Sequence, residues 1–192
     1  MTVLIAIPTF ERVHAACFQA VFDAAMYYGD CDLDIVTGYD CARARNAIAK
    51  KAIEGGYSHV LMVDSDIVIP ADCIGNLLEP AARIVLGFYR RKDDSGAFEM
   101  FSDAPGYRLM HDADLEGASD RIEVKGGGFG CAMVEVEAFK RLRFPWFVYE
   151  QREDGSVLSE DLHFSRIAQN AGIRTYADAR VLCGHVGLKT WE

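Results

Sequence analysis

An apolar run, His59-Val60-Leu61-Met62-Val63, is followed at once by Asp64-Ser65-Asp66, and this junction constrains the fold more than any other segment. A continuous apolar run of this length is typical of a strand buried on both faces, in the middle of a parallel sheet. Ligands of open α/β sheets bind at the carboxyl ends of the strands, where the two carboxylates stand. The pair indicates either a site for a hard divalent cation with phosphate or two solvated loop acids.

Apolar runs alternate with segments of helical periodicity through the first half of the chain. The predicted strands and helices, in chain order, are 3–7, 11–28 (helix), 32–37, 42–54 (helix), 59–63, 71–79 (helix) and 84–89. Asp40 is suited to cap the second helix, and Gly55-Gly56 to end it. This order predicts a parallel α/β sheet with right-handed crossovers.

The alternation stops after Arg91, and residues 92–120 are polar and irregular. The elements expected beyond this point are short strands at 98–101 and 108–110, strands at 122–125, 131–136 and 175–182, and helices at 137–143 and 159–171. We therefore expect one α/β domain over residues 1–192, with a Rossmann-like, mostly parallel sheet flanked by helices and a small mixed β region.

Composition excludes several classes of protein. A hydrophobic content of 51% supports a real core, and a net charge of −9 argues against a general binder of nucleic acid or anionic membranes. The six cysteines include no C-x-x-C pair, which favours free thiols and a cytoplasmic location. The first residues lack the basic region of a signal peptide, and no apolar run approaches the roughly 18 residues that span a bilayer.

A histidine after the last predicted strand extends the acidic pair into a candidate metal site. Asp64 and Asp66 point to the same side if the chain stays extended there. His185 lies between glycines in Cys183-Gly184-His185-Val186-Gly187, and a neutral imidazole would supply a nitrogen ligand. Such a ligand favours Mn²⁺ over Mg²⁺. The alternative is an ordinary loop histidine.

Basic residues follow two of the predicted strands. Arg43 and Asn46 share one face at the start of the second helix, where unpaired N–H groups attract anions. The alternative for both is a solvated helix surface. Arg90-Arg91-Lys92 follows strand 84–89 and could offset substrate phosphate, although a solvated loop is the preferred interpretation of Lys92.

Two acids, a glycine-rich loop and a tryptophan are further candidates. Glu160 and Asp161 follow Ser159 in the first turn of a helix, where carboxylates serve as caps. Asp161 precedes the apolar Phe164 by three residues, so it faces inward and could accept a proton from a sugar hydroxyl. The loop 126–130 is not a G-x-G-x-x-G turn, and its glycines would let the backbone approach a substrate. Trp146 is either a stacking platform for a sugar or part of the core.

Taken in order, these motifs resemble the GT-A glycosyltransferases, specifically the small family-2-like branch that uses nucleotide-diphosphate sugars. The resemblance spans nearly the whole chain and rests on Val3-Leu4-Ile5-Ala6-Ile7-Pro8-Thr9, Ala42-Arg43-Ala44-Arg45-Asn46, Val63-Asp64-Ser65-Asp66, Gly126-Gly127-Gly128-Phe129-Gly130, Ser159-Glu160-Asp161-Leu162-His163-Phe164 and Cys183-Gly184-His185.

The resemblance implies a nucleotide-sugar-binding half at 1–91 and an acceptor and catalytic half at 92–192. It places Asp64 on the ribose side and near the metal, and Asp66, from the DXD motif, on the metal and diphosphate together with His185. The residues expected to bind substrate are Pro8, Thr9, Arg43, Asn46, Asp64, Gly127, Gly128 and Trp146.

The implied reaction moves a sugar from a UDP- or GDP-sugar to an acceptor hydroxyl, with inversion. Asp161 would act as the base, with Glu160 as its catalytic neighbour. Retaining transfer on the same fold and a non-catalytic nucleotide-sugar-binding protein stay open as alternatives. A nucleotidyltransferase is disfavoured because Thr9-Phe10-Glu11-Arg12 lacks a glycine-rich loop. We expect no nucleic-acid partner and no integral membrane segment, and a homo-oligomer stays open.

Overall fold

A computed structural model describes residues 2–78, 82–102 and 108–187. The helices are α1 (Ala15–Tyr28), α2 (Cys41–Glu54), α3 (Cys73–Leu78), α4 (Val136–Arg141) and α5 (Glu160–Asn170), with a 3₁₀ turn at Asp112–Asp114. The strands are β1 (Val3–Thr9), β2 (Cys31–Thr37), β3 (His59–Val63), β4 (Ile67–Val68), β5 (Ile84–Tyr89), β6 (Met100–Ser102), β7 (Arg121–Gly127), β8 (Cys131–Glu135), β9 (Glu150–Gln151), β10 (Val157–Leu158) and β11 (Thr175–His185). Within the described residues, no helix is long and apolar enough to cross a bilayer.

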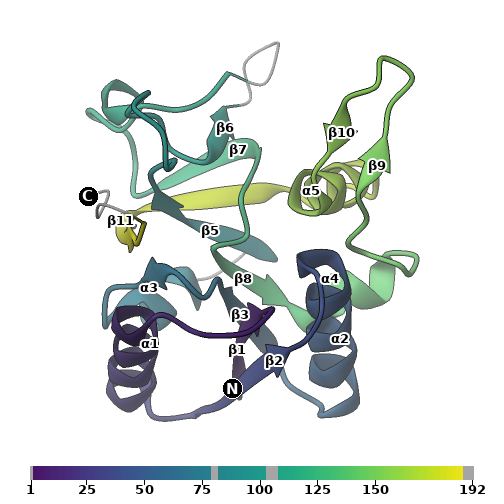
Figure 1. Cartoon of the computed structure of the whole chain (residues 1–192). Helices are drawn as coiled ribbons and strands as arrows, with labels where there is room; N and C mark the ends of the chain where they lie inside the picture. Colours follow the sequence, from purple (N-terminus) through teal and green to yellow (C-terminus); the bar gives the residue numbers. More distant parts are fainter. Residues whose placement is uncertain (1, 79–81, 103–107, 188–192) are drawn as a thin grey trace.

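One mixed sheet organises the molecule, in the order β2-β1-β3-β8-β5-β11-β7-β6, with β4 pairing on β11. β1 runs parallel to β2 and β3, and β5 runs parallel to β11. β9 and β10 form a separate hairpin beside α5 (Figure 1). The predicted α/β class, with a mostly parallel sheet between helices and a mixed β region, is confirmed.

The parallel sheet predicted from the first half of the chain is interrupted between β3 and β5. β8 lies between them and is antiparallel to both. Residues 131–134 are all buried, because a central strand needs apolar side chains on both faces. The second half of the chain therefore supplies a central strand of the sheet formed by the first half.

Helices cover both faces of this sheet (Figure 1), and a layer of apolar side chains lies on each face. Successive side chains of β1 alternate between them, with Leu4 and Ala6 in one layer and Ile5 and Ile7 in the other. The first layer holds the inner stripes of α2, α4 and α5, and the second holds those of α1 and α3. The core thus fixes which strand ends and which helix starts meet at one edge of the sheet.

Local signals in the sequence account for the helix starts. The Asp40 carboxylate accepts a hydrogen bond from the Arg43 backbone N–H at 3.0 Å and caps α2, as predicted. Ser159 precedes α5 but makes no side-chain cap, because its hydroxyl donates to Asp161 instead. The six cysteines are free thiols, as expected.

Candidate functional site

Backbone hydrogen bonds from three sides hold the acidic turn that follows β3. The Asp64 N–H donates to the carbonyl of Gly130 at 3.0 Å, and the His14 N–H donates to that of Ser65 at 2.8 Å. The Val186 N–H donates to the carbonyl of Asp66, also at 2.8 Å. The chain turns here rather than staying extended, since the Ile67 N–H reaches back to the Asp64 carbonyl. The prediction that both carboxylates face one way is therefore wrong.

A buried arginine holds the first acid of the turn. The Arg45 guanidinium, 2% exposed, donates to Asp64 Oδ1 at 2.8 Å and contacts the Glu160 carboxylate through its other terminal nitrogen. Burial raises the pKa of Asp64, the charges of Asp66 and Asp161 add to this effect, and Arg45 opposes it. Arg45 thus ties the end of β3 to the start of α5.

The pairing with Arg45 bears on one predicted role. Glu160 is 5% exposed and in contact with Arg45. The contact with Arg45 holds this carboxylate at the start of α5, and the catalytic role expected of Glu160 stays a prediction. The adjacent Asp161 is more accessible.

The second acid of the turn faces His185 and Lys92. The His185 Nε2 lies 3.7 Å from Asp66 Oδ1, and the Lys92 ammonium contacts the other carboxylate oxygen. Burial raises the pKa of Asp66, but the contacts with His185 in its doubly protonated form and with Lys92 outweigh it and lower the pKa to about 2. Lys92 lies in an exposed loop, as the sequence indicates, and its ammonium contacts Asp66 there.

The tautomer of His185 follows from its second nitrogen. Nδ1 lies 2.7 Å from the carbonyl of Arg90, and a carbonyl can only accept, so Nδ1 carries the proton. The lone pair of a neutral His185 is then on Nε2, which faces Asp66. Metal-ligating histidines commonly donate their other N–H to a backbone carbonyl in this way.

Asp161 lies at the same edge, in the first turn of α5. Its Oδ1 accepts from the Leu162 N–H at 2.7 Å and from the hydroxyl of Ser159. Burial raises the pKa of Tyr89, and the charges of Asp64 and Asp161 raise it further, which places both acids near this phenol. Asp66 and His185 thus face each other, and Asp161 lies within electrostatic range of Asp64. That these residues form one functional site stays a prediction.

The glycine-rich loop packs against Tyr89 instead of opening toward a substrate. The Gly130 N–H donates to the Tyr89 hydroxyl at 3.2 Å, and that ring lies edge-on to His185 at 5.3 Å. A Cβ at Gly128 would lie 1.8 Å from the hydroxyl oxygen. Gly127 is closed in by Met100 and by the backbone of Glu99. The expectation that Gly127 and Gly128 contact substrate is corrected: these glycines make room for protein side chains.

Gly128→Ala is expected to destabilise the protein by roughly 1–3 kcal/mol, the usual cost of overpacking a core. Removing the clashing hydroxyl with Tyr89→Phe should recover part of this loss, so the double variant should be more stable than the sum of the two single effects predicts. Urea unfolding measures each free energy. Gly75→Ala is the matched control, because nothing lies within 4 Å of a Cβ there. Equal losses at both glycines would contradict the packing argument.

Asn46 and Trp146 also have structural roles. The Asn46 amide donates to the carbonyls of Phe147 and Ala42 at 2.7 and 2.8 Å, and its oxygen accepts from the Trp146 N–H at 3.0 Å. Trp146 is 6% exposed, and its indole N–H donates to the Phe139 carbonyl at 2.9 Å. Trp146 therefore belongs to the core, which was one of its two expected places. Asn46 holds the Trp146–Phe147 segment against α2 and also lines a groove, and its contact with substrate stays a prediction.

The remaining predicted residues lie on β1 and α2. Pro8 and Thr9 are buried at the end of β1, and the Thr9 hydroxyl donates to the Arg12 carbonyl at 2.6 Å. Thr9 therefore holds the loop between β1 and α1, whose His14 N–H donates to the Ser65 carbonyl of the acidic turn. Arg43 is exposed, and its guanidinium carbon lies 5.3 Å from the centre of the Tyr39 ring. Nucleotide contact by these residues stays a prediction.

Two residues of the site were underestimated from the sequence. Arg45 stands three, four and seven residues from Ala42, Ala49 and Ala52, so it falls within the buried stripe of α2. That spacing indicates a guanidinium that is buried and paired. Lys92 gave no such signal, because its contact with Asp66 depends on how the chain turns after β5.

No protein-family model and no curated protein matches the chain. Solved structures do match its fold. A197 from STIV aligns with a TM-score of 0.68 at 19% identity, over 97% of this chain and 86% of that one. UDP-glucose pyrophosphorylase complexed with UDP-glucose aligns at 0.56 and 10% identity, over 93% and 90%. The inositol-1-phosphate CTP transferase from T. maritima aligns at 0.51 and 10% identity, over 95% and 88%.

These matches define the class of fold. The chain has an α/β fold with a mixed, mostly parallel central sheet flanked by helices, like that of nucleotide-sugar transferase-like structures. At identities of 10–19% the likeness establishes the fold alone.

Proposed function

We propose that this protein is a glycosyltransferase that moves a sugar from a nucleotide-diphosphate donor to an acceptor hydroxyl. One observation carries the proposal: Asp161, at the start of a rigid helix, shares the carboxyl edge of the sheet with an acidic turn whose two acids face different partners. This edge is where open α/β sheets bind ligands. The resemblance of the ordered motifs to GT-A enzymes points to the same chemistry.

The residues present fit a divalent cation held by few protein ligands. Asp66 offers an oxygen and His185 an Nε2 lone pair on the same side. Among the described residues no group of three or more His, Cys, Asp or Glu side chains is placed to hold a metal, and Asp64 is turned toward Arg45. Mg²⁺ and Mn²⁺ commonly complete their coordination with water and substrate phosphate, so two protein ligands suffice. The nitrogen ligand favours Mn²⁺.

The side chains divide the work of transfer in this proposal. Asp161 accepts the proton of the acceptor hydroxyl as that oxygen attacks the anomeric carbon. Asp64, oriented by Arg45, faces the nucleoside side of the donor. A bound divalent cation would supply positive charge to the departing diphosphate. The sugar inverts in a single displacement.

A panel of nucleotide-diphosphate sugars with Mn²⁺ tests the proposal, with binding followed by calorimetry and release of nucleoside diphosphate followed by chromatography. We expect at least one UDP- or GDP-sugar to bind and to be slowly hydrolysed without an acceptor. Absence of both binding and hydrolysis across the panel would refute a donor site.

A nucleotidyltransferase is the second candidate, because two of the solved structures that share the fold are named as a pyrophosphorylase and a CTP transferase. Incubation with nucleoside triphosphates and sugar 1-phosphates would release pyrophosphate in that case. The chain after β1 lacks a glycine-rich loop, so we expect no release.

Lys92→Gln is expected to tighten Mn²⁺ binding in the absence of donor. The ammonium of Lys92 and a metal ion would compete for Asp66, and an exposed pair of this kind is worth up to about 1 kcal/mol, so the gain should be roughly two- to fivefold. Electron paramagnetic resonance of Mn²⁺ measures free metal directly. Lys140→Gln on α4 is a control of equal charge change. An unchanged affinity in Lys92→Gln would show that the two cations do not share this carboxylate.

A further inference from the structure

A groove runs along the outer side of α2, beside the segment Phe144–Tyr149. Its volume is about 560 Å³, within the range of ligand pockets. The walls are mostly apolar, and three of the aromatic rings that line it are partly exposed: Tyr39 at 41%, Phe144 at 48% and Tyr149 at 48%. We call this the α2 groove. Its lining does not include Asp64, Asp66 or Asp161, although it includes Arg43 and Asn46, for which the sequence predicts contact with substrate.

Two cations of α2 line this groove. Arg43 and Lys50 are seven residues apart on one face of the helix, which sets their backbones about 10 Å apart along the axis. Each lies over an aromatic ring, Arg43 over Tyr39 and Lys50 over Phe144 at 4.1 Å. Neither forms an ion pair with a carboxylate in the described part of the chain.

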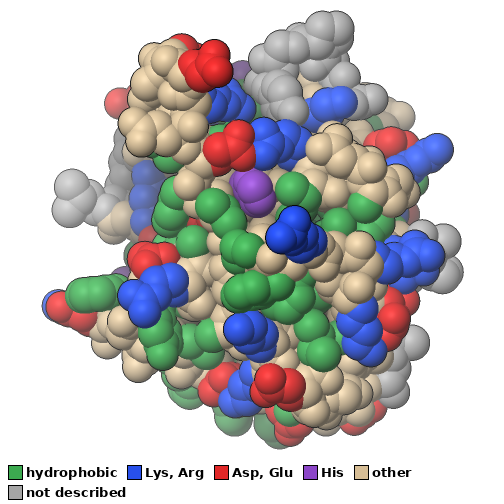
Figure 2. Space-filling model, turned by 90° about the vertical axis from the view of Figure 1, so that its right-hand side faces the viewer, with side chains coloured by type: hydrophobic (Ala, Val, Ile, Leu, Met, Phe, Trp, Pro, Cys, Tyr) green, Lys and Arg blue, Asp and Glu red, His purple; other side chains and the backbone are tan. Residues whose placement is uncertain are grey.

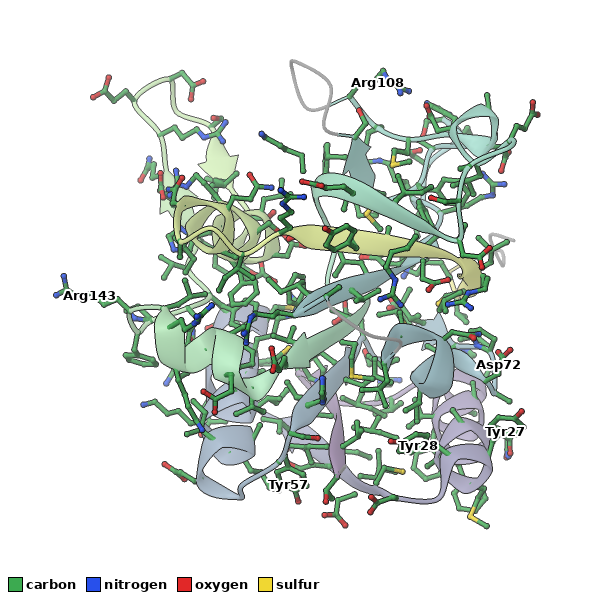
Figure 3. The ribbon with its side chains drawn as sticks, turned by 180° about the vertical axis from the view of Figure 1, so that it is seen from behind. Tyr27, Tyr28, Tyr57, Asp72, Arg108 and Arg143 are labelled. Carbon is green, nitrogen blue, oxygen red and sulfur yellow. The ribbon has the colours of Figure 1, made fainter. Side chains whose placement is uncertain are left out.

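The positive charge continues beyond the groove. Arg141 and Arg143 line a second cleft of about 550 Å³ on the other side of Phe144 and Pro145. Arg141 also acts on the nearby Glu137 carboxylate, whose pKa it helps to lower. Figure 2 shows an apolar area in the middle of this face with Lys and Arg side chains around it. Figure 3 shows Arg143 projecting away from the body of the molecule. Cations gathered on one face stand out in a chain of net charge −9.

We propose that the α2 groove binds an acidic peptide segment of a protein partner, with carboxylates at Arg43 and Lys50 and apolar side chains between them. An extended segment in the polyproline II conformation rises 3.1 Å per residue with three residues per turn, so residues three apart share a face about 9 Å apart. This matches the spacing of the two cations. A lipid phosphate carries charge at one end only and would leave one cation against its apolar tail.

The probe is a fluorescein-labelled peptide with the core Glu-Leu-Leu-Glu, flanked by Gly and Ser, and binding is followed by fluorescence anisotropy at low salt. Arg43→Gln and Lys50→Gln should each weaken peptide binding at least threefold. Phe144→Ala should also weaken peptide binding, because it removes an aromatic ring from the wall of the groove. Lys51→Gln is the matched control on the same helix, because Lys51 pairs with Asp34 outside the groove. Circular dichroism confirms that each variant is folded.

Four results would overturn the proposal. The first is equal binding of a Gln-Leu-Leu-Gln peptide, and the second is equal loss in Lys51→Gln. The third is displacement of the peptide by a nucleotide-diphosphate sugar, which would make the groove part of the donor site. The fourth is binding to vesicles of anionic phospholipid without any binding of the peptide. That result would assign this face to a membrane and reject the peptide proposal. None of these measurements needs transfer activity, so failure here is separate from failure of the proposed function.

Discussion

Asp161→Asn is expected to lower sugar transfer by about 100- to 10,000-fold while donor binding stays within about twofold of the parent protein. The amide keeps the size of the carboxylate, and its oxygen can still accept from the Leu162 N–H, so the start of α5 should hold its shape. What it loses is the capacity to take a proton from the acceptor. Transfer is measured with the donor found in the panel, and binding by calorimetry.

The control for this variant is Asp154→Asn. Asp154 is an exposed acid near the β9–β10 hairpin and accepts from the Ser156 hydroxyl, which resembles the Ser159–Asp161 pair. The Asp154→Asn variant should leave the rate of sugar transfer unchanged. A retained rate in Asp161→Asn would remove the base assignment, and a lost rate together with lost donor binding would place Asp161 in the donor site instead. An α-linked product from an α-linked donor would exclude single-step inversion.

The edge where the site lies could be predicted from the sequence because it depends on short-range rules. Buried strands end at Val63 and beyond Leu182, and α5 begins after Ser159, so Asp66, His185 and Asp161 are each placed within a residue or two. The parallel direction of β3, β5 and β11 then brings these ends together. The order and direction of the strands are enough to predict which strand ends lie at this edge.

The orientation of individual side chains could not be predicted in the same way. Asp64 and Asp66 diverge because the turn between them closes on Ile67, and the loop glycines are filled by Tyr89 from another strand. β8 enters the middle of the sheet from residues 131–135, which no local pattern specifies. These features arise from contacts between segments far apart in the chain. Sequence patterns predicted which residues reach the edge, and packing decided which of them are accessible there.

Arg45→Met is expected to cost about 3–5 kcal/mol of unfolding free energy, the largest stability effect among the variants considered. Methionine fills much of the space but leaves Glu160 buried and without its partner, and it frees Asp64 from its 2.8 Å contact. A buried carboxylate without a counter-charge is the main cause of the cost. Urea unfolding followed by circular dichroism gives the free energy.

The double variant Arg45→Met with Glu160→Gln separates the charge from the packing. Neutralising the orphaned carboxylate should recover at least half of the loss, because a buried amide is cheaper than a buried unpaired charge. Arg45→Lys should lie between the parent and Arg45→Met, since one ammonium cannot match the two-sided contact of a guanidinium. A loss below about 1 kcal/mol in Arg45→Met, the range of exposed ion pairs, would contradict a buried bridge between β3 and α5. Donor binding by the folded fraction of Arg45→Met should also fall, because the same side chain holds Asp64, the carboxylate that we propose faces the nucleoside of the donor.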